Sequence, residues 1–82
     1  MQETLKYFDN KIIELRRKLL SRADSLALNP YIGQFEIYLD HLEEDHRRII
    51  EGQYKIIYYI EDDKVFISDF FNTREDPSKM KG

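Results

Sequence analysis

The stretch that decides the fold is HRRIIEGQYKIIYYIEDDKVFISDFFNTREDP, which runs from His46 to Pro77. It contains three runs rich in isoleucine, valine, tyrosine and phenylalanine, the side chains that fit a half-buried pleated surface. The first run ends at Gly52, and the acidic segment 61–64 (EDDK) separates the other two. So short a polar turn between two apolar runs predicts a β-hairpin. We place the Tyr54–Ile60 run in the centre of an antiparallel sheet, because it carries apolar side chains on both faces.

Upstream of this stretch, the segment QFEIYLD alternates apolar and polar residues. Phe35, Ile37 and Leu39 recur with a period of two, which predicts a further strand with these three side chains toward the core. The next residues, 40–46 (DHLEEDH), are too charged for a core and predict a solvated turn. Together the patterns predict three to four antiparallel strands between residues 34 and 71.

The first part of the chain predicts a helix over residues 1–28. Apolar residues recur there at spacings of three, four and seven, as one face of a helix requires; they are Leu5, Phe8, Ile12, Leu15, Leu19 and Leu26. We favour one long helix over a helical hairpin broken near Asp9, because the apolar phase continues through that position. Pro30 and Gly33 in the segment NPYIG end the helix. The fold class is therefore α+β, with the helix packed on one face of the sheet.

Composition limits what this chain can be. Its 82 residues are enough for a single domain, residues 1–82, whose last part (72–82) is a polar tail. Without cysteine it has no disulfides and no thiolate metal site, and a cytoplasmic location fits that absence. The apolar runs are too short for a membrane span, and the first ten residues lack the pattern of a signal peptide. The net charge of −3 argues against general nucleic-acid binding.

Four motifs in order resemble the RelE/ParE superfamily of toxins from bacterial type II toxin–antitoxin modules. They are the helix end LALNPYIG (Leu26–Gly33), the arginine-rich strand ending at Gly52, the Tyr54–Ile60 strand and the closing segment Arg74–Pro77. The resemblance covers about residues 20–77. It implies a toxin with a cognate antitoxin, which adds a strand to the toxin sheet or lays a helix across its apolar groove. It implies no cofactor.

The front of the chain departs from the family pattern. Family members begin with a strand and a helical hairpin, whereas this chain shows no candidate first strand and a single helical run. The segment between Gly33 and Arg47 is also longer than usual. The resemblance therefore implies a toxin whose N-terminal part is shortened or rebuilt. A helix of about 25 residues spans roughly 38 Å and would extend past the sheet, which exposes Leu5 and Phe8. We expect a second copy to cover them, in a homodimer or a domain swap.

Two mechanisms occur on this fold according to the resemblance: ribosome-dependent mRNA cleavage, and inhibition of DNA gyrase without chemistry. An endoribonuclease needs cations for the phosphate and titratable groups for the proton transfers. Arg47, Arg48, Lys55 and Arg74 are the candidate phosphate clamp, but no histidine or tyrosine follows Arg74. We therefore favour the ParE-like reading, in which Arg47, Arg48 and Arg74 contact the target. An inactive or engineered dimeric remnant of the fold is a third reading.

Simpler explanations stand beside these assignments. The three arginines also fit exposed ion pairs with Glu51, Glu75 or Asp76, which contribute only about 0–1 kcal/mol each. The segment HLEEDH holds two histidines among acids, but their five-residue spacing fixes no metal geometry, so we expect no metal. The tyrosines of the Tyr54–Ile60 strand are expected in the core rather than stacked on bases.

Overall fold

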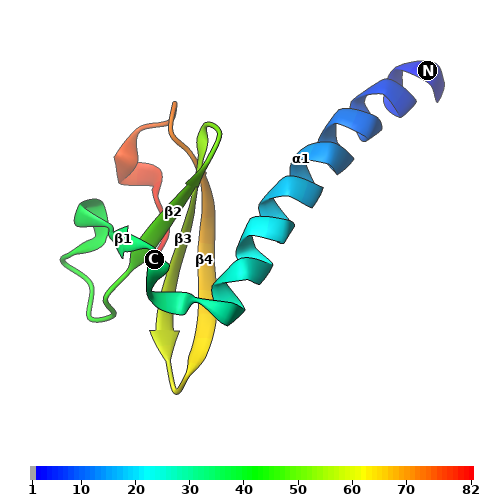
Figure 1. The fold of residues 1–82 in the computed structure, drawn as a ribbon. Helices are drawn as coiled ribbons and strands as arrows, with labels where there is room; N and C mark the ends of the chain where they lie inside the picture. The colour runs from blue at the N-terminus through cyan, green and yellow to red at the C-terminus, as the bar shows by residue number, and fades with distance from the viewer. Residues whose placement is uncertain (1) are drawn as a thin grey trace.

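The structure, a computed structural model, describes the backbone from Gln2 to Gly82 and the side chains of residue 11 and residues 13–82. One helix is followed by a four-stranded antiparallel sheet and three short 3₁₀ turns (Figure 1). The elements are α1 (Gln2–Leu28), η1 (Pro30–Ile32), β1 (Gln34–Phe35), η2 (Ile37–Leu39), β2 (Arg47–Glu51), β3 (Tyr54–Glu61), β4 (Lys64–Asn72) and η3 (Pro77–Lys79). The predicted α+β class is confirmed.

Helix α1 is continuous over 27 residues, so the alternative of a helical hairpin is wrong. No glycine or proline interrupts it. Its C-terminal half packs on the sheet through Leu19 and Leu26, and Arg22 forms an ion pair with Glu51 of β2 at 3.3 Å. Its N-terminal half projects away from the sheet (Figure 1).

The apolar stripe continues along the projecting half of α1. Ile13 is 57% exposed and Leu15 is 37% exposed, which agrees with the predicted overhang of the helix. The side chains of Leu5 and Phe8, for which exposure was predicted, lie outside those that the structure describes.

The sheet has the order β1-β2-β3-β4, so β3 is internal as predicted. Successive residues of β3 face opposite sides, and both sides are covered. On the helix side, one cluster of buried side chains comprises Leu19, Leu26, Ile49, Ile56 and Tyr58. On the other side, a second cluster comprises Leu39, Ile57, Phe71 and Met80. The C-terminal tail therefore runs back across this face of the sheet and buries Met80 there.

The β3–β4 hairpin is confirmed, and its turn explains the acidic segment. Asp62 and Asp63 both have positive φ, 52° and 61°. A two-residue hairpin turn of this kind requires that conformation, which aspartate adopts more readily than most residues.

The strand predicted over 34–40 ends already at Phe35. Its predicted inward side is also wrong: Phe35 is 56% exposed and Ile37 is 69% exposed, while Glu36 is buried at 2%. Only Leu39 is in the core as expected. The backbone N–H of Tyr38 bonds to the Glu36 carboxylate, which starts η2 in place of a longer strand. A buried ion pair thus overrides the alternating pattern at this position.

Candidate functional site

Tyr58 fixes the turn between α1 and β1 onto the sheet. Its hydroxyl donates to Pro30 O at 2.6 Å and accepts from the backbone N–H of Gly33 at 3.0 Å. A Cβ atom at Gly33 would lie 2.5 Å from that hydroxyl oxygen and 2.7 Å from Arg48 O, so only glycine fits. Both backbone groups of the turn therefore depend on one fully buried side chain.

Replacing Tyr58 with phenylalanine is expected to lower the free energy of unfolding by about 1–3 kcal/mol, because a buried N–H and a buried C=O lose their partner.

Burial raises the pKa of the Tyr58 hydroxyl above its usual 10.0, although the hydrogen bond from Gly33 and the charge of Arg47 oppose this. Above pH 10 the unfolded chain therefore ionises first, and wild-type stability falls until the folded pKa is reached.

Urea unfolding between pH 8 and 11 measures both effects, with the variant Tyr59→Phe as the matched control. A Tyr58→Phe protein that keeps the same alkaline slope as the wild type would contradict this account.

Glu36 is the centre of a charged cluster on the face of the sheet away from the helix. Its Oε1 lies 2.9 Å from Lys55 Nζ and 3.8 Å from Arg48 Nε. The Lys55 ammonium also lies 5.3 Å from the Tyr38 ring centroid, within the range of a cation–π contact. Sequence reasoning missed Glu36, because it read this acid as the polar side of a strand. No local signal identified it, because its two cations lie on β2 and β3, far from Glu36 in the sequence.

Arg47 is paired with Tyr58 across β2 and β3 and holds the same turn from the same face of the sheet. Its Nη1 donates to Gly33 O at 2.7 Å and lies 3.4 Å from Tyr31 O. Its guanidinium carbon lies 4.3 Å from the Phe35 ring centroid and 5.2 Å from that of Tyr31. The predicted ion pair with Glu51 is not formed, because that acid pairs with Arg22. Arg47 therefore has an evident structural role.

Arg48 is similarly occupied by the chain itself. Its guanidinium donates to Phe35 O and, at 3.2 Å, to Gln34 Oε1, in addition to facing Glu36. Arg48 thus fastens the short β1 to β2. A phosphate would have to compete with these internal partners.

Arg74 lies beyond the end of β4 and is exposed. The preceding residue, Thr73, donates its backbone N–H to Gln53 O, so Arg74 sits near the β2–β3 turn. Among the described contacts its side chain makes no hydrogen bond or ion pair, including with Glu75 and Asp76. Its cation is available for a partner.

The structure brings together only two of the four candidate clamp residues. Arg48 and Lys55 share the Glu36 carboxylate, while Arg47 turns to the opposite face of β2 and Arg74 stands at the far end of that strand. His46 precedes β2, at the opposite end from Arg74. It is 3% exposed, and its Nδ1 donates to Glu44 O at 3.0 Å. His41 lies in the same segment before β2, so neither described histidine is placed to work with Arg74.

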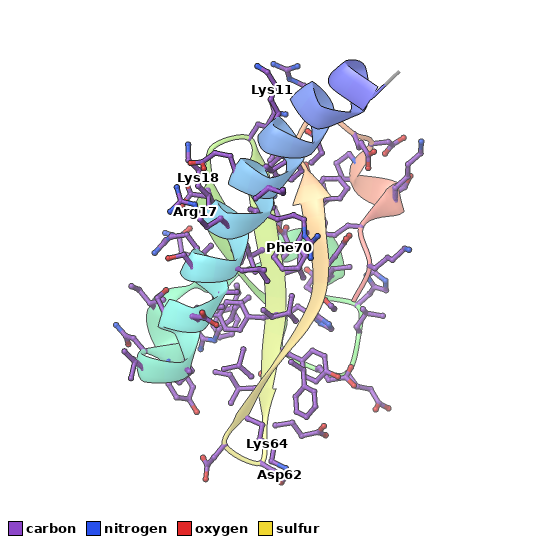
Figure 2. The ribbon with its side chains drawn as sticks, turned by 90° about the vertical axis from the view of Figure 1, so that its right-hand side faces the viewer. Lys11, Arg17, Lys18, Asp62, Lys64 and Phe70 are labelled. Carbon is purple, nitrogen blue, oxygen red and sulfur yellow. The ribbon has the colours of Figure 1, made fainter. Side chains whose placement is uncertain are left out.

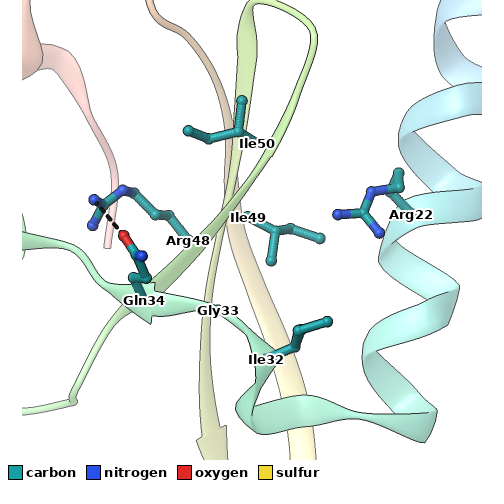
Figure 3. A pocket seen from close by; sticks show the side chains of 7 residues that line it. All are labelled: Arg22, Ile32, Gly33, Gln34, Arg48, Ile49 and Ile50. Atoms are coloured by element: carbon teal, nitrogen blue, oxygen red, sulfur yellow. Dashed lines mark hydrogen bonds between the residues drawn. The ribbon is translucent and has the colours of Figure 1, made fainter.

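Two concave regions flank α1. The first, of about 330 Å³, is an apolar groove between the helix and the edge strand β4, lined by Arg16, Leu19, Leu20 and Phe70; Phe70 lies beside the helix in Figure 2. The second, of about 260 Å³, lies between α1 and β2 (Figure 3) and is lined by Arg22, Ile32, Gly33, Gln34, Arg48, Ile49 and Ile50. Beside it, β1 pairs only with Arg47 and Arg48, so the outer edge of β2 beyond Arg48 has no strand partner in the described chain.

The described residues also bear on metal binding and on membrane insertion. No group of three or more histidine, aspartate or glutamate side chains among them is placed to hold a metal ion, and no helix is long and apolar enough to cross a membrane.

Comparison with known proteins gives one finding. A family model described as "ParE toxin of type II toxin-antitoxin system, parDE" matches residues 3–77, nearly the whole chain. The match includes α1, all four strands and Arg74. Neither the curated proteins nor the solved structures that were compared gave a match.

Proposed function

Because the chain belongs to the ParE toxin family of type II toxin–antitoxin systems, we propose that it acts by binding and inhibiting a target such as DNA gyrase. A cognate antitoxin, which the family implies, neutralises it. No cofactor takes part. One observation supports this proposal most: Arg47, Arg48 and Lys55 form hydrogen bonds or an ion pair with groups of the chain itself.

These internal contacts of the three cations favour a toxin that binds its target over one that cleaves RNA. A ribonuclease site needs cations that reach the phosphate and a titratable group beside them. Here the cations hold a turn, a short strand and a buried carboxylate, and His46 is buried at the opposite end of β2 from Arg74. RelE-like cleavage of mRNA on the ribosome is therefore the weaker candidate.

The target contact in this proposal centres on Arg74, whose exposed guanidinium has no partner among the described contacts. Arginine is enriched among the residues that dominate binding energy at protein interfaces. Arg47 and Arg48 contribute indirectly, since they hold the turn and the strand beside them.

The antitoxin contact in this proposal uses the groove between α1 and β4. Leu20 is 50% exposed and Phe70 is 38% exposed there, and the outer edge of β4 borders the groove. Such a surface fits an amphipathic helix or an added strand. A cytoplasmic location and a homodimer through α1 belong to the same proposal.

Inducing the chain in a bacterium while pulse-labelling DNA, RNA and protein synthesis tests the proposed target. We expect DNA synthesis to stop first, and the purified chain to inhibit DNA supercoiling by gyrase. The variant Arg74→Ala should weaken that inhibition about 30-fold, which corresponds to about 2 kcal/mol of binding free energy at an interface hot spot.

Lys79→Ala is the matched control, because it removes another exposed cation from the same tail. Early loss of protein synthesis would favour the mRNA-cleaving alternative. Soluble, folded protein that inhibits neither process would identify the chain as a fold without toxin activity.

A further inference from the structure

Tyr31, Phe35 and Arg47 form one patch at the β1 edge of the sheet. Phe35 is paired with Arg47 across β1 and β2, so the two side chains lie on the same face of the sheet. The Arg47 guanidinium lies within cation–π distance of both the Tyr31 ring and the Phe35 ring. The two aromatic residues are nevertheless 65% and 56% exposed. We call these three residues the aromatic–arginine patch.

The charge of Arg47 has no counter-charge within the described part of the chain. Arg48 and Lys55 share the carboxylate of Glu36, whereas Arg47 forms no ion pair among the described contacts. Its Nη1 donates to backbone oxygens of the turn before β1, but its Nε and Nη2 have no hydrogen-bond partner among these contacts. The guanidinium is therefore held through one nitrogen and keeps N–H groups available on the other two.

The contact between Lys55 and Tyr38 is a useful comparison, because it pairs a cation with an aromatic ring elsewhere on the sheet. Lys55 Nζ lies 5.3 Å from the Tyr38 ring centroid and 2.9 Å from Glu36 Oε1, so a carboxylate completes this arrangement inside the chain. Arg47 has two rings beside it and lacks the carboxylate. An acid from outside the chain would complete the aromatic–arginine patch in the same way.

We propose that the aromatic–arginine patch is a second contact surface for the target and binds an acidic segment of that protein. A carboxylate of the target accepts hydrogen bonds from Nε and Nη2 of Arg47, which form a charge-assisted pair of fixed geometry. Apolar side chains next to this carboxylate pack on the rings of Tyr31 and Phe35. Since this contact rests on the proposed function, inhibition of a target such as DNA gyrase, it adds a direct role to the indirect one of Arg47.

An acidic protein segment fits the patch better than a nucleic acid does. Nucleic-acid backbones bind through several cations gathered on one surface. Arg47 is the single cation of this patch, in a chain whose net charge is −3. Tyrosine and arginine are also enriched among the side chains that dominate binding energy at protein interfaces.

The patch and the proposed antitoxin groove lie at opposite edges of the sheet. The patch includes Phe35 of β1, the groove is lined by Phe70 of β4, and the strand order is β1-β2-β3-β4 (Figure 1). A segment that fills the groove therefore leaves the patch open, so we assign the patch to the target rather than to the antitoxin. Arg47 begins β2, and Arg74 lies near the turn that follows this strand, so the target contacts both ends of β2.

The Kd of the full chain for purified gyrase, measured at low and at physiological salt, tests this contact. Tyr31→Ala/Phe35→Ala should raise the Kd about 30-fold, the effect of losing an interface hot spot. Arg47→Gln removes the charge while keeping an N–H donor, and should also raise the Kd about 30-fold at low salt. The wild type should bind more weakly as salt rises, and Arg47→Gln should show a smaller salt dependence.

Tyr38→Ala is the matched control, because Tyr38 is 51% exposed and lies beside a cation whose charge is already balanced. It should leave the Kd unchanged, and far-UV circular dichroism with urea midpoints checks the fold of every variant. The ring variant keeps the test decisive if Arg47→Gln unfolds, since both rings are exposed.

The outcomes separate this contact from the proposed function. A wild type that neither binds nor inhibits gyrase overturns both. Gyrase binding that the ring variant leaves unchanged, or that Tyr38→Ala weakens equally, overturns the contact alone. Binding of duplex DNA without gyrase, lost in Arg47→Gln, would replace the acidic protein segment with a nucleic acid and would also overturn it.

Discussion

Replacing Leu26 with alanine is expected to leave most of the protein unfolded at room temperature. Leu26 is fully buried between α1 and the sheet, in the cluster that also contains Ile56 and Tyr58. Removing such a side chain costs about 2–5 kcal/mol through lost burial and the cavity left behind. A domain of this size is stable by only about 3–5 kcal/mol, so this loss is comparable with the whole stability.

Leu28→Ala is the matched control for this prediction. Leu28 lies two residues further along the same helix and is 91% exposed. Its removal should change the free energy of unfolding by no more than about 0.5 kcal/mol. Urea midpoints by circular dichroism compare the two variants, and equal midpoints would mean that α1 does not pack on the sheet as described.

Replacing Glu36 with glutamine is expected to have the second-largest effect, a loss of about 3 kcal/mol, because it leaves two cations without a counter-charge in a part-buried site. The side chains of Lys55 and Arg48 are only 17% and 22% exposed, and that of Glu36 is 1% exposed. Their remaining access to water places the loss at the lower end of what breaking a buried ion pair costs. Thermal unfolding near pH 7 measures the change.

A double replacement separates charge from shape at this site. Glu36→Leu/Lys55→Met removes the closer ion pair with similar side-chain volumes. Arg48 keeps its hydrogen bonds to Phe35 O and Gln34 Oε1, so the double variant should recover much of the stability that Glu36→Gln loses. Glu14→Gln is the exposed control, since the Glu14–Arg17 pair lies at the helix surface and its loss should shift the midpoint little. If Glu36→Gln also shifts the midpoint little, the carboxylate does not organise this face of the sheet.

The candidate site was only partly predictable, and Arg47 and Arg48 show why. Because they are adjacent in the sequence, both were assigned to the same candidate clamp and target contact. Adjacent residues of a strand point to opposite faces, so Arg47 holds the turn beside Tyr31 while Arg48 reaches Glu36. Arg74 was predictable as an exposed cation at a strand end, because it depends on local position alone.

By itself, the sequence determined the helix over Gln2–Leu28 and the strands from Arg47 to Asn72, because these elements follow from local apolar periodicity, the proline and glycine that end α1, and the Asp62–Asp63 turn. Only the tertiary structure decided that Glu36 is buried while Ile37 is exposed, and that Met80 joins the core. Both depend on groups distant in the chain: two cations on β2 and β3, and an uncovered sheet face. Local periodicity carries no information about such partners.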